Sequence, residues 1–270
     1  MSDRRSTLPV VHAWMTAALM ALASGIGLLV PTVYRDVAWI EAAWAGNDLV
    51  TLLVVVPAMV IGLLLWKRGS RLGELLVYSV FAYSIYGYAY YLFGAALNVL
   101  LPLYVSLVVV PLIGLAVALR RLDAEAVAGD FAERTPVRLV AGYMVFTGVG
   151  LGIAWLAQWA AYVFGGTEPS VGAEPFKLVA SLDLTLIVPF MVLGGVLLWR
   201  RRAWGYVLGA IYTIKGATYT LVLTAGSFVG SMRGVEGSAA QVPIWGVWTL
   251  VGAVAAFLLL RGVRGARKSA

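Results

Sequence analysis

Apolar residues form long, unbroken runs in this chain, and short polar turns separate them. A membrane-spanning helix needs about 20 mostly apolar residues, and a chain in lipid must pair its backbone groups within helices or a closed barrel. The runs do not alternate and are about twice as long as a strand, so they predict helices. Eight runs cover Pro9 to Val30, Leu49 to Trp66, Leu72 to Phe93, Val99 to Leu119, Leu139 to Phe164, Val179 to Trp199, Ala203 to Val229 and Pro243 to Leu260. We therefore expect an all-α, polytopic bundle of about eight transmembrane helices.

Composition agrees with a lipid bilayer as the solvent. Of 270 residues, 61% are hydrophobic and 12% are charged, whereas a soluble domain carries about 25% charge. The net charge of +7 comes from short basic clusters between the apolar runs, which indicates topology signals rather than nucleic-acid binding. The chain contains no cysteine, which excludes disulfides, thiolate metal ligands and a cysteine nucleophile.

The basic residues predict the orientation, because cytoplasmic loops of membrane proteins are rich in Lys and Arg. With the N-terminus inside, 16 of the 20 basic residues fall on the cytoplasmic side. Three fall outside, namely Arg35, Lys177 and Arg233, and Lys215 lies within a span. We expect a multi-pass protein of the inner (plasma) membrane with both termini in the cytoplasm.

The alternative of a signal peptide cleaved after Ala23 would leave seven spans with the same orientation, but the chain stays apolar through Val30.

The two halves of the chain resemble each other. The second span contains Val56-Pro57 and the sixth contains Val188-Pro189, and each ends in an apolar stretch, a tryptophan and basic residues. A glycine, Gly73 or Gly205, then opens the next span. This pattern predicts a four-plus-four repeat with both copies in one orientation and the repeat axis along the membrane normal. The predicted units are residues 1–119, a cytoplasmic linker at 120–138 with a short surface helix, and residues 139–270.

Several strings resemble a family of bacterial multi-pass membrane proteins. They are Asp48 to Leu52, Lys67 to Ser70, Tyr86 to Gly94 followed by Asn98, Trp199 to Arg202 with Gly205 and Tyr206, and Lys215 to Thr218. The resemblance covers nearly the whole chain. That family has no assigned activity, so the resemblance implies the architecture and a prokaryotic membrane, and it transfers no catalytic residue.

Lys215 is the most informative single residue. It follows Gly205 by about 15 Å along a helix, which places it near the middle of the bilayer. A cation there costs from about 2.5 kcal/mol upward, so it should face the bundle and be paired. Asp183 lies about 24 Å from the inner end of the sixth span, and we expect a Lys215–Asp183 pair that opens toward the outside. Such a pair is either a substrate or proton site or a structural link between two helices.

Tyrosines and a second acid extend this candidate site. Tyr83 and Tyr86 share one face of the third span and are too deep for an interfacial aromatic belt, so their hydroxyls need partners inside the protein. A polar cavity beside Lys215 would supply them, and interhelical hydrogen bonding is the alternative. Asp48 lies at the outer end of the second span, as Asp183 does in the sixth. Both acids could instead interact with helix N-termini.

Other catalytic signals are missing from the sequence. A single histidine cannot build a histidine-based metal site, and no nucleotide-binding loop, HExxH motif or dinucleotide fingerprint is present. A retinal-type Schiff base at Lys215, flanked by Tyr212 and Tyr219, has no supporting signature. We therefore expect no catalytic residue, metal or cofactor, and the missing motifs argue against an enzyme without excluding one.

Three functions fit these features. The first is transport or binding of a small molecule in an outward-facing cavity formed by Lys215, Asp183, Tyr83, Tyr86 and Asp48. The second is an accessory or sensory subunit that partners another membrane protein. The third is a membrane enzyme acting on a lipid or an isoprenoid. Repeats, proline kinks and a charge in mid-membrane favour the first.

Overall fold

The computed structural model describes residues 7–169 and 171–263. Throughout this part of the chain, the regular elements are helices, which confirms the predicted all-α class. In chain order they are α1 (Thr7–Leu29), η1 (Pro31–Val33), α2 (Ala38–Val50), the π-helical η2 (Thr51–Val55), α3 (Val56–Lys67), α4 (Arg71–Gly94), α5 (Leu101–Arg120), α6 (Ala124–Gly129), α7 (Val137–Gly165), α8 (Ala173–Leu186), α9 (Val188–Trp199), α10 (Ala203–Met232) and α11 (Ser238–Leu260).

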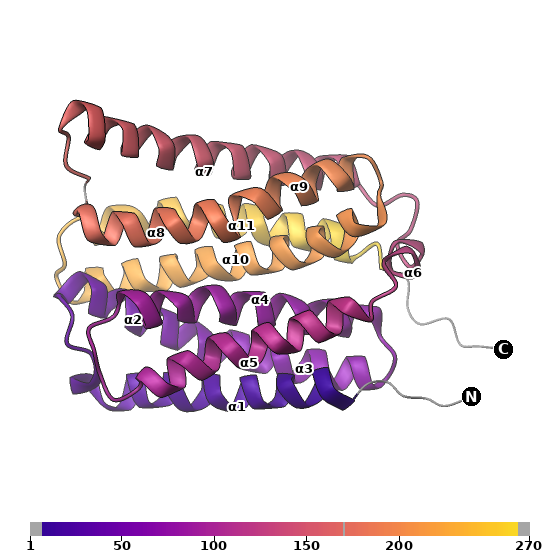
Figure 1. The fold of residues 1–270 in the computed structure, drawn as a ribbon, viewed down its shortest axis with the longest axis horizontal. Helices are drawn as coiled ribbons and strands as arrows, with labels where there is room; N and C mark the ends of the chain where they lie inside the picture. Colours follow the sequence, from indigo (N-terminus) through magenta and orange to yellow (C-terminus); the bar gives the residue numbers. More distant parts are fainter. Residues whose placement is uncertain (1–6, 170, 264–270) are drawn as a thin grey trace.

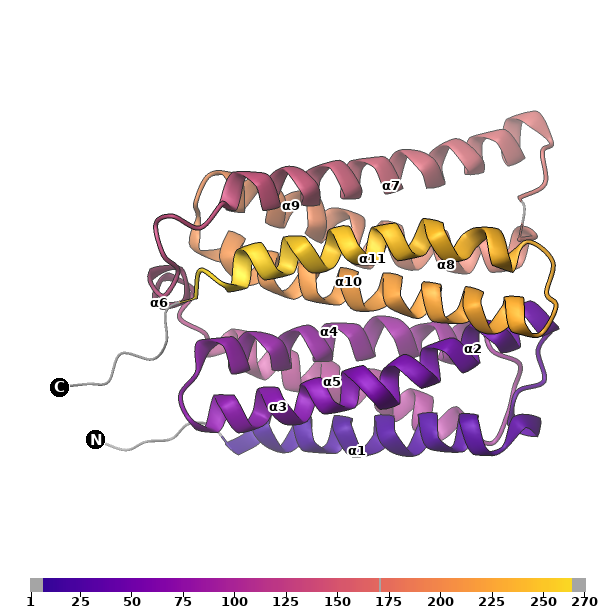
Figure 2. The same ribbon diagram turned by 180° about the vertical axis from the view of Figure 1, so that it is seen from behind.

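The long helices run side by side along the long axis of the molecule (Figure 1). Two of the rods are broken: α2, η2 and α3 form one, and α8 and α9 form the other. The elements α1 to α5 lie together, and α7 to α11 lie above them in Figure 1. Helix α10 packs on α2 and α4 across the boundary and on α11 within its own half, as the view from behind shows (Figure 2).

The fold is that of a multi-pass membrane protein. Seven helices in the described part of the chain are long and apolar enough to cross a bilayer, if each broken rod counts as one. The remaining long helix, α4, has a similar length but carries six tyrosines and lies in the middle of the bundle. Neighbouring helices shield it from lipid, so it can hold hydroxyl groups there. Large apolar side chains are instead exposed on outer helices, as Ile113, Ile153 and Leu250 are.

Both broken rods begin earlier than the apolar runs predicted. Helix α2 starts at Ala38 rather than Leu49, and α8 starts at Ala173 rather than Val179. Polar residues such as Asn47 had ended the apolar run, but in the structure this side chain is buried inside the bundle. Hydropathy does not distinguish a polar residue that faces other helices from one that faces water.

Most basic residues gather at one end of the bundle, which we call the basic end. The turns α3–α4 and α9–α10 and the linker with α6 lie at this end (Figure 1). The described residues there include Lys67, Arg68, Arg71, Arg120, Arg121, Arg134, Arg138, Arg200, Arg201, Arg202 and Arg261. Arg35, Lys177 and Arg233 belong to segments at the opposite end. The remaining predicted inside residues, Arg4, Arg5, Arg264, Arg267 and Lys268, lie outside the described residues.

The linker helix α6 packs inward onto α10. Asp123 caps it by accepting a hydrogen bond from the Ala126 backbone N–H at 3.0 Å. Val127 is fully buried, and the Phe131 ring lies 4.9 Å from that of Tyr206. Arg71 ties α4 to the same segment, because its Nε donates to Asp130 at 2.8 Å. The predicted short helix is therefore present, and its segment is anchored to α10 and, through Arg71, to α4.

The turns after α3 and α9 share one backbone path. Arg68 and Arg200 have φ, ψ values of −83°, 4° and −82°, 5°, and the next residues, Gly69 and Arg201, both have positive φ. Four residues later in each turn, a glycine lies against the backbone of the preceding helix. A side chain at Gly73 would collide with the Trp66 backbone, and one at Gly205 with the Leu198 backbone. An offset of 132 residues relates both pairs of glycine contacts.

Candidate functional site

Lys215 lies in the middle of the 30-residue helix α10 and is 3% exposed. Its ammonium group lies over the face of the Tyr86 ring, 3.3 Å from the centroid, and 4.9 Å from the centroid of Tyr219. Tyr219 follows Lys215 by one helical turn, and Tyr86 comes from α4 in the other half. A desolvated cation–π contact is worth about 2 kcal/mol or more, so the two rings partly replace water around the ammonium.

The Lys215 ammonium makes no hydrogen bond or ion pair with any residue that the structure describes. Its stabilisation comes from the two ring faces and from the longer-range attraction of Asp183. An ammonium group has three N–H donors and no acceptor. These N–H donors therefore have no acceptor among the described residues, in a side chain that is almost fully buried.

Asp183 is held by two donors from different helices. Its Oδ1 accepts the Tyr86 hydroxyl at 2.5 Å, and its Oδ2 accepts the Trp155 indole N–H at 2.9 Å. The carboxylate is 6% exposed. Tyr86 thus connects Lys215 and Asp183, with its ring face on the cation and its hydroxyl on the anion. The structure brings the predicted pair together, but through a tyrosine rather than by direct contact.

Tyr90 completes the surroundings of this group. Its ring centroid lies 5.4 Å from that of Tyr86 and 6.2 Å from that of Tyr219. Its hydroxyl is buried and has no hydrogen-bond partner among the described residues. We call Lys215, Tyr86, Tyr219, Asp183 and Trp155 the Lys215 site, and the Tyr90 hydroxyl adds a second unsatisfied donor beside it.

Asp48 lies in a separate network of the first half and is 1% exposed. Its Oδ2 accepts the Tyr34 hydroxyl at 2.5 Å, and its Oδ1 accepts the Tyr91 hydroxyl at 3.1 Å. Tyr91 in turn accepts the Asn47 side-chain N–H at 2.9 Å. The carboxylate therefore has two phenol donors from two different segments of the first half.

Tyr83 joins this second group and not the Lys215 site. Its hydroxyl donates to Asn47 Oδ1 at 2.8 Å and lies 2.8 Å from Thr51 Oγ1. We call the connected residues Tyr34, Asp48, Tyr91, Asn47, Tyr83 and Thr51 the Asp48 network. The expectation that Tyr83 and Tyr86 would share one cavity is wrong, because Tyr83 bonds to Asn47 and Thr51, whereas Tyr86 bonds to Asp183 on a different helix.

Both acids lie in the last turn of a helix, directly before a break. Asp48 precedes the π-helical segment Thr51–Val55, and Asp183 precedes Ile187, whose φ and ψ are −112° and −61°. The alternative explanation that these acids interact with helix N-termini is therefore wrong. Neither carboxylate lies in the first turn of its helix, where a helix dipole would stabilise it, so the hydroxyl and indole donors must do so.

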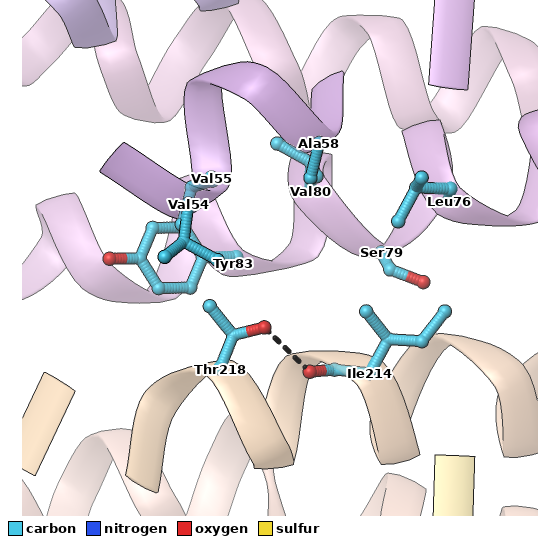
Figure 3. A pocket seen from close by; sticks show the side chains of 9 residues that line it. All are labelled: Val54, Val55, Ala58, Leu76, Ser79, Val80, Tyr83, Ile214 and Thr218. Atoms are coloured by element: carbon cyan, nitrogen blue, oxygen red, sulfur yellow. Dashed lines mark hydrogen bonds between the residues drawn. The ribbon is translucent and has the colours of Figure 1, made fainter. Parts of the chain in front are cut away.

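A small cavity lies at the boundary between the halves, next to Tyr83 (Figure 3). Its volume is about 20 Å³, which is room for roughly one water molecule. The lining comes from η2 and α3, from α4 and from α10, and Ser79, Tyr83 and Thr218 carry its hydroxyl groups. Thr218 is already bonded to the Ile214 carbonyl at 2.8 Å. Lys215 does not line this cavity.

Sequence reasoning missed several of these residues. Trp155 lies on α7 among other apolar residues, and nothing in its surroundings marks it as a donor to Asp183. Asn47 precedes Asp48 directly, and this polar pair within a helical stretch was the available signal. No family model, curated protein or solved structure matches the chain. The resemblance to a bacterial membrane protein family therefore stays a prediction.

Proposed function

We propose that this protein binds a small solute at the boundary between its two halves and carries it across the membrane. The observation that carries the proposal is the Lys215 ammonium, which is buried on the face of Tyr86 without a hydrogen bond or ion pair among the described residues. Keeping a cation inside a membrane protein is costly, and such residues mark substrate or ion pathways by default. An anionic group on the solute would supply the acceptors that the ammonium lacks.

Asp183, Tyr86 and the unpartnered Tyr90 hydroxyl support the same proposal. Asp183 balances the charge of the empty site through Tyr86, and a bound anion competes with it for the ammonium. The Tyr90 hydroxyl offers one more donor to the solute. Because the site is closed in this structure, solute entry requires α4 and α10 to separate, and the two broken rods provide flexible points for such a movement.

The two halves of the chain also fit an internal repeat. We infer that residues 1–119 and 139–270 are two copies in the same orientation, joined by the linker at 120–138. The matching turns, the paired glycine contacts and the break in each second rod support this inference. Under the positive-inside rule, the basic end faces the cytoplasm of a prokaryotic cell, and the opposite end faces outward.

A panel of small anions tests the function directly. Purified protein in detergent is heated with acetate, succinate, glutamate or inorganic phosphate, and the Tm is compared with that of protein alone. We expect at least one anion to raise the Tm of the wild type and of Lys177→Met, but not that of Lys215→Met. Lys177 is a suitable control because it is exposed and forms a surface ion pair with Glu174.

Uptake of the stabilising anion into proteoliposomes then distinguishes a transporter from a binding protein. If no anion shifts the Tm, or if the shift persists in Lys215→Met, solute recognition by Lys215 is wrong. A Lys215→Met protein that loses only its abundance in the membrane would instead support an accessory subunit.

A further inference from the structure

The two buried acids differ in their counter-charges. Asp183 has Lys215 within its electrostatic reach. At the offset of 132 residues that relates the turns, Lys215 corresponds to Tyr83, so the first half has a phenol where the second half has a cation. Asp48 is nevertheless as deeply buried as Asp183.

Every described group that faces the Asp48 carboxylate is neutral. Helix α10 meets α2 through the backbone of Gly226, which lies against Ala43 and Gly46, so this contact contains no charged group. On the same helix, Glu41 lies about two turns away. The titratable groups around the carboxylate are phenols, from the α1–α2 connection, α4 and α5: Tyr34, Tyr83, Tyr88, Tyr91 and Tyr104.

An ionised carboxylate in such a place carries a desolvation cost of several kcal/mol, and two phenol hydrogen bonds offset only part of it. A positive partner is therefore required for part of the functional cycle. The limited space around Asp48 favours the smallest positive partner, a proton. A side chain at Gly27 would collide with Asp48 Oδ2 and with the Tyr34 hydroxyl, so helix α1 closes directly over the carboxylate. A metal ion would need room between several oxygens, whereas a proton needs none.

We propose that Asp48 is a proton-binding site that exchanges with the outer side through Tyr34. Tyr34 lies in the connection between α1 and α2, at the end opposite the basic end, and is 7% exposed. In the exchange, a hydronium ion outside protonates the Tyr34 oxygen while the original phenol proton passes to Asp48 Oδ2. Water is left outside, the phenol is restored, and Asp48 becomes neutral. Burial and the neighbouring Asp48 carboxylate raise the pKa of Tyr34, so this phenol stays protonated between transfers.

The remaining network accommodates both states of Asp48. The Tyr91 hydroxyl has two acceptors in reach, Asp48 Oδ1 at 3.1 Å and the Trp44 carbonyl at 3.2 Å. It therefore keeps a partner if the carboxyl turns its own O–H toward Tyr91. From Tyr91 the bonds continue through Asn47 to Tyr83, which lines the cavity shared with α10. Protonation can thus alter contacts beside the Lys215 helix, and this coupling step rests on the proposed function.

Infrared difference spectroscopy tests the site without any solute. Wild-type protein in lipid nanodiscs is moved between acidic and alkaline buffer, and the C=O band of protonated carboxyl groups is recorded. We expect a band from a water-shielded carboxylic acid that disappears in Asp48→Asn and remains in Glu41→Gln. Asp48→Asn preserves the shape of the side chain, and its amide oxygen can still accept the Tyr34 hydroxyl while its NH2 group faces the Tyr91 oxygen. Folding of the variant is checked by gel filtration and circular dichroism.

Two further measurements make the outcome decisive. In Tyr34→Phe the band should remain, but its isotope shift after transfer to heavy water should be slower than in the wild type. A band that persists in Asp48→Asn, or no such band in the wild type, overturns the proton site. An unchanged isotope-shift rate in Tyr34→Phe overturns the route through Tyr34.

Coupling to the solute is measured separately, so the two proposals can fail independently. The Tm shift caused by the effective anion should depend on pH in the wild type and lose that dependence in Asp48→Asn. If no anion binds, the proposed function fails while the infrared band still decides the proton site. If an anion binds with the same pH dependence in both proteins, the coupling is wrong.

Discussion

The Lys215 site and the Asp48 network use similar parts in different ways. In each, an acid in the last helical turn before a break accepts hydrogen bonds from a tyrosine of α4. The Lys215 site adds a cation across a tyrosine ring, whereas the Asp48 network adds a row of phenols and an amide. The comparison teaches that burial alone does not define the role of a membrane acid. The presence or absence of an internal cation decides whether the acid has a fixed partner or needs an external one.

The largest expected effect comes from removing one charge of the Lys215 site. In Asp183→Asn, the Lys215 ammonium stays buried without an anion, and we expect a loss of about 3–5 kcal/mol in the free energy of unfolding. Asp48→Asn leaves no opposite charge behind and should cost at most about 1 kcal/mol. Unfolding by sodium dodecyl sulfate in mixed micelles measures both variants. Equal losses would mean that the two acids do not differ in their counter-charges.

Removing both charges should restore much of that loss. The double variant Asp183→Asn with Lys215→Met leaves no unpaired ion, so we expect it to be at least about 2 kcal/mol more stable than Asp183→Asn alone. The matched control combines Asp48→Asn with Lys215→Met, whose effects should add. A double variant at the Lys215 site that simply sums the two single losses would show that the charges do not interact.

The bridging role of Tyr86 gives the next effect. Tyr86→Phe keeps the ring under Lys215 but removes the hydroxyl that donates a hydrogen bond to Asp183. Because hydrogen bonds to charged groups are worth about 1.5–3 kcal/mol, we expect a loss of that size in the free energy of unfolding. Tyr86→Leu also removes the ring, with a further loss of about 2 kcal/mol. The same mixed-micelle titration resolves the two steps. If Phe and Leu behave alike, the ring face does not stabilise the ammonium.

Alanine substitutions at Gly73 and Gly205 test whether the turns of the two halves are equivalent. Gly73→Ala and Gly205→Ala each place a methyl group against the backbone of the preceding helix, so we expect similar losses of about 1–3 kcal/mol. Gly150→Ala is the control, because open space surrounds that position and alanine favours a helix. A loss of stability at only one of the two turns would contradict the inference that the two halves are copies.

The smallest effect concerns the residue with left-handed backbone in each turn. Arg201 has a φ of 52°, which is unfavourable for a residue with a side chain, and Gly69 has a φ of 82°. Arg201→Gly should stabilise the protein by up to about 1 kcal/mol, whereas Gly69→Ala should destabilise it by about the same amount. Thermal unfolding in detergent detects both changes. Effects of the same sign would contradict a shared turn.

Much of the fold was predictable because it depends on local composition. Long apolar runs predicted the helices, and the spacing of basic clusters predicted which turns share one end. The apolar runs predict late starts for α2 and α8, because polar residues end a hydropathy signal without ending a helix: Asn47 is buried within α2, and Glu174 and Lys177 are exposed in the first turns of α8. The candidate site was predicted in part: Lys215, Asp183 and Tyr86 do lie together, whereas Tyr83 belongs with Asp48.

The sequence by itself determined the solvent of this protein, its helical class and the end of the bundle at which the basic residues gather. These properties follow from the free energy of moving each residue from water into lipid, which depends little on distant neighbours. Only the tertiary structure decided that a tyrosine separates Lys215 from Asp183, that Trp155 completes the acid's hydrogen bonds and that no described residue places a cation beside Asp48. Those contacts depend on the rotation and packing of helices that are far apart in the chain, and helical periodicity does not specify them.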